Sequence, residues 1–270
     1  MTATHTFETR QLTAGYDQRI ILKEIDVVIP QNKISIIIGA NGCGKSTLLK
    51  SMARLIKPTS GEILLDGTSI FKMASKQLAK TVGLLPQTPV VPEGITVADL
   101  VGRGRFPHQS LMGNWSKEDY EAVANALEMM NITEFADRPI DELSGGQRQR
   151  VWIAMALAQQ TDILFLDEPT TYLDITYQVE ILDLLTELNK KHGITIVMVL
   201  HDINLSARYA DHLFAVKDGQ LLAQGSPADI ITSDLIEDVF NLKCHVISDP
   251  ISNSPLILPI GKYHLCGLEK

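Results

Sequence analysis

The sequence predicts an α/β fold whose central sheet is mainly parallel and buried on both faces. Short apolar segments rich in Ile, Val and Leu recur along the chain, and Gly, Pro, Asp or His follows each of them. These segments are 34–38, 82–85, 163–166 and 195–200. Segments with helical periodicity lie between them. Because ligands gather at the carboxyl ends of strands in open α/β sheets, we expect the four strand ends to form one shared site.

The first 33 residues predict β-strands that precede this sheet. Apolar residues there follow a nearly alternating pattern, at Ile20, Leu22, Ile25, Val27 and Ile29. A further strand is expected at 61–65, and the Asp66-Gly67 dipeptide after it is typical of a hairpin turn. We therefore expect an antiparallel β portion at the N-terminal end.

Helices are expected after the first strand, at 45–53, and in two later stretches. In the first of these, Val151, Ala154, Leu157 and Ala158 share one helical face. In the second, at 176–191, the apolar positions are Ile181, Leu185 and Leu188. Each pattern indicates a helix that covers the sheet with one apolar face.

The remaining segments suggest an insert and an extension. Residues 90–145 hold Pro and Gly early and a helix-like run at 117–130, which predicts a helical insert between sheet strands. From Asp249 onward, prolines among apolar residues indicate an edge strand or a surface arm. We expect a single domain over 1–270, with 1–88 and 160–248 as β and core parts, 89–159 as the helical part and 249–270 as a C-terminal extension.

Composition excludes several classes of protein. The 270 residues are 45% hydrophobic and 21% charged, so disorder is not expected. The net charge of −8 argues against binding nucleic acid chiefly by phosphate neutralisation. The three cysteines (Cys43, Cys244 and Cys266) have no C-x-x-C spacing, which indicates free thiols in a reducing compartment. No apolar run approaches the ~20 residues of a membrane helix and no secretory signal is evident, so we expect a cytoplasmic protein that spans no membrane itself.

The strongest motif is G-A-N-G-C-G-K-S at 39–46, which matches G-x-x-x-x-G-K-[ST] between a strand and a helix. Its glycines let backbone N–H groups converge on phosphate oxygens, and the helix N-terminus adds its positive end. Lys45 is expected to reach the β- and γ-phosphates, and the Ser46 hydroxyl to bind Mg²⁺. Cys43 suits a variable position better than a redox switch. The residues predicted to bind the nucleotide here are Gly39, Ala40, Asn41, Gly42, Cys43, Gly44, Lys45, Ser46 and Thr47.

Three other strand ends supply candidate catalytic groups. Asp167 and Glu168 follow the strand at 163–166, where Asp167 would bind the metal and Glu168 would act as general base for the attacking water. His201 ends the next strand and is expected to contact the γ-phosphate or position the water. Gln87 follows the strand at 82–85, and its amide could contact metal or water. The predicted metal ligands are thus Ser46, Gln87 and Asp167.

A second motif lies at Leu143-Ser144-Gly145-Gly146-Gln147, ahead of an apolar helix. Ser144 and Gln147 have the S-x-x-Q spacing of a capping box, and the two glycines expose the backbone at this helix N-terminus. A well-capped helix would explain the spacing alone. However, one nucleotide needs one cradle, and this chain encodes two helix ends suited to phosphate.

Together, the cradle, L-S-G-G-Q and I-L-F-L-D-E-P-T resemble the ATP-binding cassette family over nearly the whole chain. The resemblance implies a P-loop NTPase (RecA-like) core, an N-terminal antiparallel β subdomain and an inserted α-helical subdomain, with ATP and Mg²⁺ as cofactors. It also implies a head-to-tail homodimer. In that dimer the signature residues Ser144, Gly145, Gly146 and Gln147 of one subunit close on the γ-phosphate in the other subunit's cradle.

Other positions match the family one by one. Tyr16 matches the aromatic residue that stacks on adenine, Gln87 the Q-loop glutamine, Thr171 to Asp174 the D-loop that contacts the other subunit, and His201 the switch histidine. Tyr172 departs from the small residues common there, which leaves the catalytic assignment intact.

Three stretches, 102–109, 170–175 and 199–211, are similar to the ATPases of bacterial iron–siderophore importers, relatives of those for haem and cobalamin. Tyr177 departs from the His frequent in that group. The resemblance implies separate transmembrane permease subunits, indirectly an extracytoplasmic substrate-binding protein, and a peripheral position on the cytoplasmic face of the membrane. Residues near 102–112 and Gln87 are expected to meet the permease.

Alternative functions remain open at this point. The ATPase could serve haem or cobalamin import. A soluble relative acting on DNA or ribosomes is disfavoured, because about 100 residues without sustained heptads separate the two motifs and only one cassette is present. A GTPase or nucleotide kinase is disfavoured because Asn189-Lys190-Lys191 is followed by His192 rather than completing N-K-x-D, and because the signature would have no role.

Overall fold

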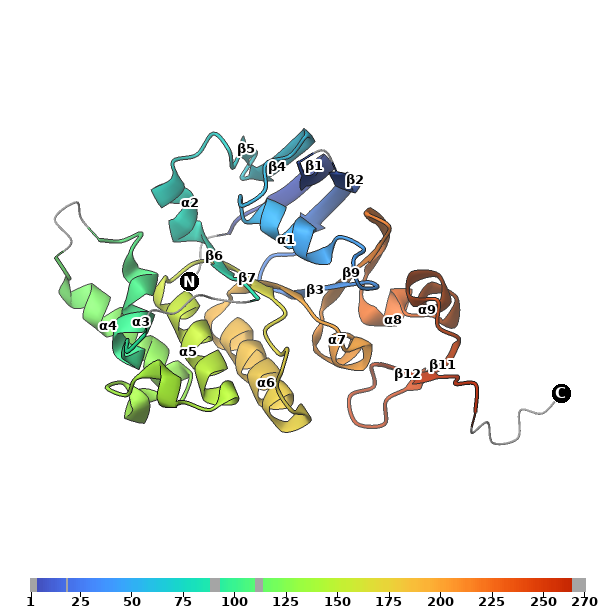
Figure 1. Cartoon of the computed structure of the whole chain (residues 1–270). Helices are drawn as coiled ribbons and strands as arrows, with labels where there is room; N and C mark the ends of the chain where they lie inside the picture. Colours follow the sequence, from blue (N-terminus) through green and yellow to red (C-terminus); the bar gives the residue numbers. More distant parts are fainter. Residues whose placement is uncertain (1–3, 18, 88–92, 110–113, 264–270) are drawn as a thin grey trace.

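The computed structural model describes residues 4–17, 19–87, 93–109 and 114–263. Its centre is a six-stranded sheet with the order β10-β9-β3-β8-β7-β6 (Figure 1). The neighbours from β9 to β6 are parallel, and β10 runs antiparallel to β9. The strands are β3 (Ile34–Ile38), β6 (Val82–Leu85), β7 (Ile163–Asp167), β8 (Thr195–Val199), β9 (His212–Lys217) and β10 (Gln220–Gly225). The predicted α/β fold is confirmed.

The four predicted strands lie next to one another in this sheet. All residues of β3, β7 and β8 are buried, which is why these strands appear in the sequence as continuous apolar runs. Because β3, β8, β7 and β6 are parallel, their carboxyl ends meet at one edge of the sheet. Strands β9 and β10, which the sequence analysis did not assign, extend the sheet beyond β3.

A second, antiparallel sheet with the order β2-β1-β4-β5 confirms the predicted N-terminal β portion. Its strands are β1 (Phe7–Tyr16), β2 (Arg19–Ile29), β4 (Ser60–Leu65) and β5 (Thr68–Ser69). Within β2, Leu22, Ile25, Val27 and Ile29 are buried, whereas Ile20 is exposed. The pairing of β1 with β2 shifts register along its length, and Glu24 has a φ of 50°, so the alternation changes phase between Leu22 and Ile25.

Helices cover both faces of the central sheet (Figure 1). The first helix, α1, lies towards the antiparallel sheet, and α5, α6 and α7 lie on the opposite side of the central sheet. The α-helices are α1 (Lys45–Met52), α2 (Ser75–Thr81), α3 (Val97–Gly102), α4 (Lys117–Met129), α5 (Gly145–Ala158), α6 (Ile175–His192), α7 (Ile203–Tyr209), α8 (Pro227–Ile230) and α9 (Ser233–Phe240). Short 3₁₀ turns are η1 (Arg103–Arg105), η2 (Thr133–Phe135) and η3 (Ile140–Glu142).

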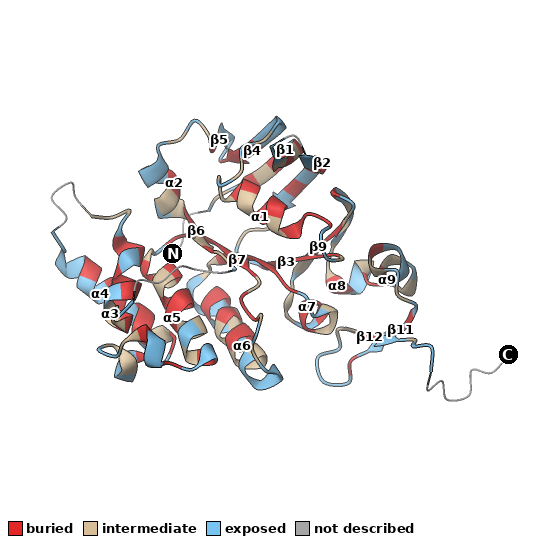
Figure 2. Ribbon diagram, viewed as in Figure 1, coloured by how far each residue is buried: buried red, intermediate tan, exposed pale blue. Residues whose placement is uncertain are grey.

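Helix α5 differs from the one-faced helix expected from its sequence. Trp152, Ile153 and Ala156 are buried along with Val151, Ala154 and Ala158, whereas Leu157 is only partly buried. The helix packs against β6 on one side and against α3 and α4 on others. Burial on several sides removes the polar face that a surface helix would keep. Figure 2 shows buried residues both in the central sheet and in α5.

The core has two parts, one on each face of the central sheet. Residues alternate between them along β3, where Ile36 and Ile38 pack with the α3 to α9 side and Ile37 packs with α1 and the antiparallel sheet. The central sheet therefore holds its strand ends between two packed layers. The division into core, helical part and extension by residue number stays a prediction.

The C-terminal segment forms a hairpin of β11 (Cys244–Ser248) and β12 (Pro255–Pro259), a sheet separate from the other two. The segment therefore forms strands, as one of the two expectations stated, but these strands pair with each other and not with the edge of the central sheet. Cys43 and Cys244 are free and buried, and Cys266 lies outside the described residues. Within the described ranges, no helix has the length and apolar character needed to cross a membrane.

Candidate nucleotide-binding and hydrolysis site

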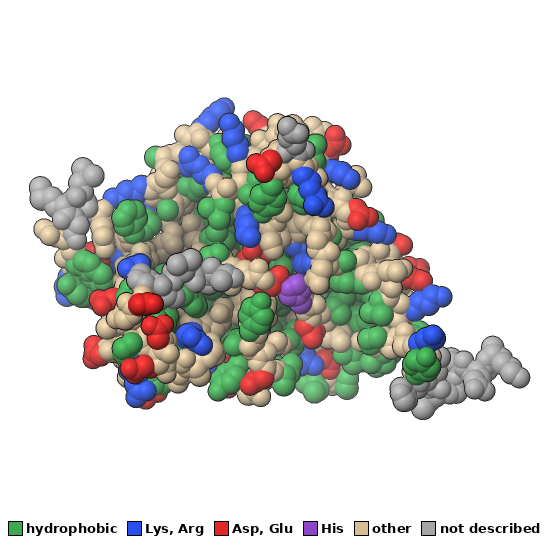
Figure 3. Space-filling model, in the orientation of Figure 1, with side chains coloured by type: hydrophobic (Ala, Val, Ile, Leu, Met, Phe, Trp, Pro, Cys, Tyr) green, Lys and Arg blue, Asp and Glu red, His purple; other side chains and the backbone are tan. Residues whose placement is uncertain are grey.

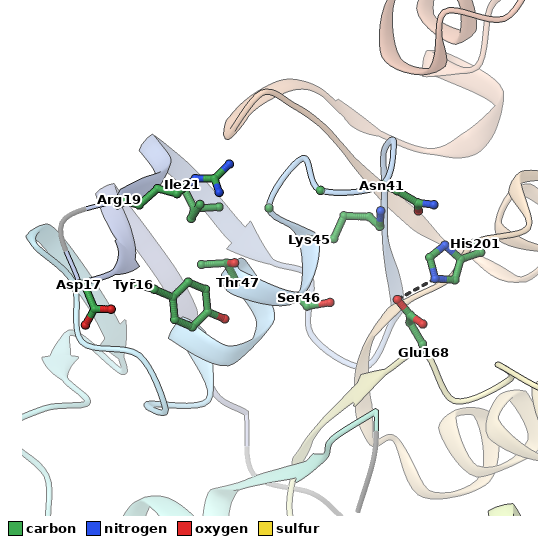
Figure 4. A pocket seen from close by; sticks show the side chains of 12 residues that line it. Tyr16, Asp17, Arg19, Ile21, Asn41, Lys45, Ser46, Thr47, Glu168 and His201 are labelled. Atoms are coloured by element: carbon green, nitrogen blue, oxygen red, sulfur yellow. Dashed lines mark ion pairs between the residues drawn. The ribbon is translucent and has the colours of Figure 1, made fainter.

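A pocket of about 570 Å³ lies over the start of α1 and the ends of the central strands. This volume is in the range of sites that enclose a small organic ligand. Figure 4 shows its lining, which includes many of the residues predicted from the sequence. The lining residues are Tyr16, Asp17, Arg19, Ile21, Asn41, Gly42, Gly44, Lys45, Ser46, Thr47, Glu168 and His201.

The loop before α1 has the backbone of an anion cradle. Gly44, the N-cap residue of α1, has a φ of 112° and supplies no side-chain cap. A Cβ at Gly39 would lie 2.3 Å from the carbonyl oxygen of Val216, so this position accepts only glycine without a shift. Because no side chain caps this helix, its N-terminus is suited to an anionic ligand.

Lys45 is buried and folds back over the loop. Its Nζ donates to the carbonyl oxygens of Gly39 at 2.8 Å and Ala40 at 3.0 Å. These two hydrogen bonds hold the ammonium within the cradle, where its charge is available to phosphate oxygens.

Ser46 and Asp167 meet as predicted for metal ligands. The Ser46 Oγ donates to Asp167 Oδ1 at 2.8 Å, and the Asp167 side chain is fully buried. Asp167 Oδ2 has no hydrogen-bond partner, although Lys50 Nζ lies 3.6 Å away. A buried carboxylate oxygen without a donor, next to a hydroxyl, is a donor set that suits Mg²⁺. Lys50 was not anticipated, since a lysine in the last turn of a helix carries no distinctive signal.

Glu168 is the centre of a hydrogen-bonded group at the same edge. His201 Nε2 lies 2.7 Å from Glu168 Oε1. Gln87 Nε2 lies 2.5 Å from Glu168 Oε2, and Thr171 Oγ1 lies 3.0 Å from that same oxygen. The structure brings the three predicted residues Gln87, Glu168 and His201 together, and it adds Thr171. Gln87 contacts the carboxylate of Glu168 through its amide nitrogen, and its role as a metal ligand stays a prediction.

The backbone at Glu168 is unusual, because its φ is 56° in a residue that is not glycine. Such a conformation costs free energy and persists only where surrounding contacts impose it. Here it accompanies a side chain aimed at His201, as Figure 4 shows. The carboxylate is largely buried, whereas the His201 ring is about half exposed to the pocket.

Tyr16 lies on the other side of the cradle from Glu168 and His201, with Ser46 and Thr47 between them (Figure 4). Its ring is exposed, as expected for a residue that awaits a planar ligand. Asp17, Arg19 and Ile21 line the same end of the pocket, and the sequence analysis had not selected them. Nucleotide stacking on Tyr16 stays a prediction.

The signature residues begin α5 and do not line this pocket. Ser144 Oγ accepts a hydrogen bond from the Gln147 N–H at 3.3 Å, and Gln147 Oε1 accepts one from the Ser144 N–H at 2.9 Å. This capping box confirms the spacing seen in the sequence. Ser144 and Gly145 are exposed, and a Cβ at Gly145 would meet no atom within 4 Å. In a single subunit this helix end therefore faces solvent.

The segment that joins β7 to α6 is also exposed. Tyr172 is 94% exposed with a φ of 65°, and Ile175 is 62% exposed. Large apolar side chains held this far into solvent are typical of an interaction surface. The sequence-based expectation of an exposed tyrosine in the D-loop agrees with this geometry.

Two further expectations concern the Cys43 thiol and the charge of the surface. Burial raises the pKa of the Cys43 thiol, with Lys45 opposing, so Cys43 has little thiolate character at neutral pH. On the face shown in Figure 3, acidic and basic side chains are interspersed and form no continuous basic band. This pattern gives no support to phosphate-backbone binding.

A parallel sheet whose strand ends carry a phosphate-binding loop, a buried aspartate and a neighbouring glutamate defines a P-loop ATPase. The sequence model of the ABC transporter family matches residues 22–171, and the chain belongs to this family. ATP-binding proteins of ABC transporters are ATPases coupled to transport, and their cassettes dimerise and work with separate permease subunits in importers.

Several relatives match almost end to end. The petrobactin import ATP-binding protein FpuD of Bacillus anthracis is 54% identical over 94% of this chain and 93% of its own length. The ferric enterobactin transport ATP-binding protein FepC of Escherichia coli is 50% identical, covering 93% of each chain. The iron(3+)-hydroxamate import ATP-binding protein FhuC of Bacillus subtilis is 48% identical over 98% of each.

Solved structures agree on the fold. The cbiO1 protein of Clostridium perfringens, part of the ABC transporter complex cbiONQ, has a TM-score of 0.75 at 32% identity and covers 87% of this chain and 94% of its own. A dimeric structure of a bacterial ABC transporter cassette has a TM-score of 0.71 at 30% identity, covering 82% of this chain and 98% of that one.

Proposed function

We propose that this chain is the ATP-hydrolysing, energy-coupling subunit of a bacterial importer for iron–siderophore complexes. The observation that carries the proposal is the end-to-end match to relatives named for petrobactin, ferric enterobactin and iron(3+)-hydroxamate, at 48–54% identity. The cargo follows from these relatives, because the ATPase site itself does not contact cargo. Import of haem or cobalamin is the alternative.

The site residues divide the chemistry of hydrolysis among them. Lys45 holds the β- and γ-phosphates, and Ser46 with Asp167 would hold Mg²⁺, which neutralises charge on the phosphates. Glu168 accepts the proton of the attacking water, since its carboxylate lines the pocket beside the cradle. His201 and Gln87 each contact one oxygen of Glu168 and orient it. His201 also lines the pocket, which supports a contact with the γ-phosphate.

The complete site requires a second copy of this chain arranged head to tail. The signature end of α5 is exposed and lines no part of the pocket in its own subunit, which supports its use in the partner's site. The exposed Tyr172 and Ile175 lie on the segment that would meet the other subunit. The dimeric relative supports the same assembly. ATP binding would close the dimer and hydrolysis would reopen it.

A separate permease supplies the membrane path and places this subunit on the cytoplasmic face of the membrane. The segment 102–109 offers a contact for it, since Phe106 is 77% exposed beside the exposed Arg103. Met112 lies outside the described residues. The end of this segment is tied to α2 by Lys76, whose Nζ donates to the Gln109 carbonyl at 2.5 Å. An extracytoplasmic binding protein would deliver cargo to the permease and act on this chain only indirectly.

The proposal is tested by radiolabelled uptake in a strain that lacks this gene, supplied with a panel of ferric siderophores, haem and vitamin B12. We expect uptake of at least one ferric siderophore to fall to background and to recover with the wild-type gene but not with Glu168→Gln. Loss confined to haem or vitamin B12 would favour the alternative. Unchanged uptake of every iron chelate would refute siderophore import and leave the ATPase assignment intact.

A further inference from the structure

The C-terminal hairpin of β11 and β12 packs on α7, the short helix that follows the catalytic histidine. Strand β8 ends at Val199, and His201 follows after one residue. Asp202 caps the first turn of α7 by accepting from the Leu205 N–H at 2.8 Å. Any tilt of α7 therefore moves the backbone that carries His201. Figure 1 shows β12 near α7, and the two elements are in contact although they are far apart in the sequence.

Asn204 joins α7 to the hairpin through two hydrogen bonds with one residue. Its Nδ2 donates to the Ile257 carbonyl oxygen at 3.2 Å, and its Oδ1 accepts from the Ile257 N–H at 2.8 Å. Ile257 is 1% exposed and packs into the core beneath α7. The amide side chain thus satisfies both backbone groups of a buried residue in β12, a role for which asparagine has the matching donor and acceptor.

A second connection lies one turn further along the same face of α7. Arg208 NH2 donates to Asp249 Oδ2 at 2.5 Å, and Asp249 is almost fully buried. Asp249 also accepts from the Ile251 N–H and the Ser252 hydroxyl. These hydrogen bonds, with the Arg208 guanidinium, hold the pKa of Asp249 well below its usual range, so the ion pair persists at neutral pH.

The opposite side of α7 is fixed by the core. Leu205 and Ala207 are buried there, and the fully buried Ser206 hydroxyl donates to the Asp202 carbonyl at 2.7 Å. The helix therefore packs on the core and is bonded to the hairpin through Asn204 and Arg208. By contrast, the His201 ring is 47% exposed, so its own surroundings restrain it little beyond the contact with Glu168. The orientation of the ring depends on the helix that follows it.

We infer that the C-terminal hairpin is a brace that holds α7 in place, and that α7 in turn keeps the His201 side chain in contact with Glu168. Asn204 and Arg208 are then positioning residues for ATP hydrolysis. The inference depends on the ATPase activity of the family and not on the proposed cargo. It gives the C-terminal extension a role in catalysis, at a site that does not touch the nucleotide.

The test is a kinetic comparison of Asn204→Ala and Arg208→Met in the full-length chain. We expect kcat for ATP to fall about 5- to 10-fold in each, because Glu168 is less often oriented, while KM for ATP stays within twofold because the cradle is untouched. Arg208→Lys, which keeps the charge, should recover most of the lost rate. Asn189→Ala is the matched control, since Asn189 makes the same kind of bond, to the Ile194 carbonyl, at the other end of β8.

A double-mutant cycle with His201→Ala separates positioning from general destabilisation. Single-turnover hydrolysis should show that Asn204→Ala has no further effect once His201 is removed, since the brace acts through that side chain. An equal fold-loss in both backgrounds would overturn the inference. It would also be overturned by a kcat loss in Asn189→Ala that matches that of Asn204→Ala, or by wild-type kcat in both brace variants. These outcomes leave the proposed import function unaffected, because that function has a separate test, the uptake of ferric siderophores.

Discussion

Helix α1 follows a glycine-rich loop and helix α5 begins with two glycines, and the two helix ends are capped differently. At α1, the N-cap is Gly44 and no side chain caps the helix, while Lys45 and Ser46 surround an open pocket. At α5, Ser144 and Gln147 cap each other's backbone, and the exposed Gly145 faces open space. The α1 end lies inside a pocket and has no side-chain cap, whereas the α5 end lies on the surface and has a capping box.

This difference indicates the order in which the two helix ends bind phosphate. The α1 end has charge, a hydroxyl and a buried carboxylate around it, so it can bind a nucleotide in one subunit. At the α5 end, the capping box satisfies the N–H groups of Ser144 and Gln147 and so stabilises the start of the helix without a ligand. We propose that this helix end contacts a phosphate only when a second subunit brings one. We therefore expect that one chain is enough to bind the nucleotide and that hydrolysis requires two chains.

The largest expected effect is that of Glu168→Gln, which removes the base beside α1 and keeps the shape of the side chain. We expect kcat for ATP to fall by about 10²- to 10⁴-fold, the usual contribution of a general base. ATP binding, measured by equilibrium titration, should remain. Glu187→Gln, which alters an exposed carboxylate of α6, is the control and should retain full activity. Near-normal turnover in Glu168→Gln would remove this residue from the role of base.

Gly145→Glu tests the α5 end alone. A negative side chain in the first turn of a helix is favourable, and glycine is a weak helix former, so the free energy of unfolding should stay equal or rise by up to about 1 kcal/mol. The same charge would repel a phosphate delivered by the partner, so ATPase activity should fall about 10²-fold. Ser75→Glu places the same charge at the start of α2 and should keep its activity. An active Gly145→Glu would contradict phosphate binding at α5.

Lys50→Met tests the electrostatics of the α1 end, because it removes the cation that lies 3.6 Å from Asp167 Oδ2. The buried carboxylate then lacks its nearest positive charge, and we expect the nucleotide-free protein to lose about 1 kcal/mol of stability in urea denaturation. Mg²⁺ should bind the ATP-loaded protein several-fold more tightly, because no ammonium competes for Asp167. Lys57→Met, at an exposed site beyond α1, is the control. Unchanged Mg²⁺ titration would show that Lys50 does not compete at this site.

The smallest effect belongs to His5, which is remote from both helix ends. Burial alone would lower the pKa of His5, but hydrogen bonds and charge from Asp66 and Asp162 outweigh it and raise the pKa above 6.5. The contribution to stability is therefore complete below pH 6.5 and is lost as the pH rises through the folded-state pKa.

Asp66 has the opposite dependence on pH. Burial would raise its pKa, but His5 and the Thr6 N–H lower it below 3.8, so its contribution is lost in acid. Wild type should thus exceed His5→Gln in stability by about 0.5 kcal/mol between pH 4.5 and 6, as measured by denaturant unfolding, and by less at pH 8. A gap that widens above pH 7 would contradict this sign.

The sequence was most informative where a function restricts residue type at fixed spacing. The cradle, the Asp167-Glu168 pair and the capping box all follow from such spacing, and the four buried strands follow from their continuous apolar runs. Contacts between residues far apart in sequence could not be derived in this way. The bonds from Asn204 to Ile257 and from Lys50 to Asp167 depend on the folded backbone, as does the left-handed conformation of Glu168. The packing of α5 on three sides depends on the neighbouring helices.

The two-chain site is tested most directly by the mass of Glu168→Gln in solution, measured by sedimentation with and without ATP and Mg²⁺. We expect the mass of the Glu168→Gln protein to double from the 29.8 kDa of one chain when ATP is added. Adding Gly145→Glu to the same variant should keep it a monomer while ATP still binds. A Glu168→Gln protein that binds ATP at saturation and stays at the mass of one chain would contradict the claim that hydrolysis requires two subunits.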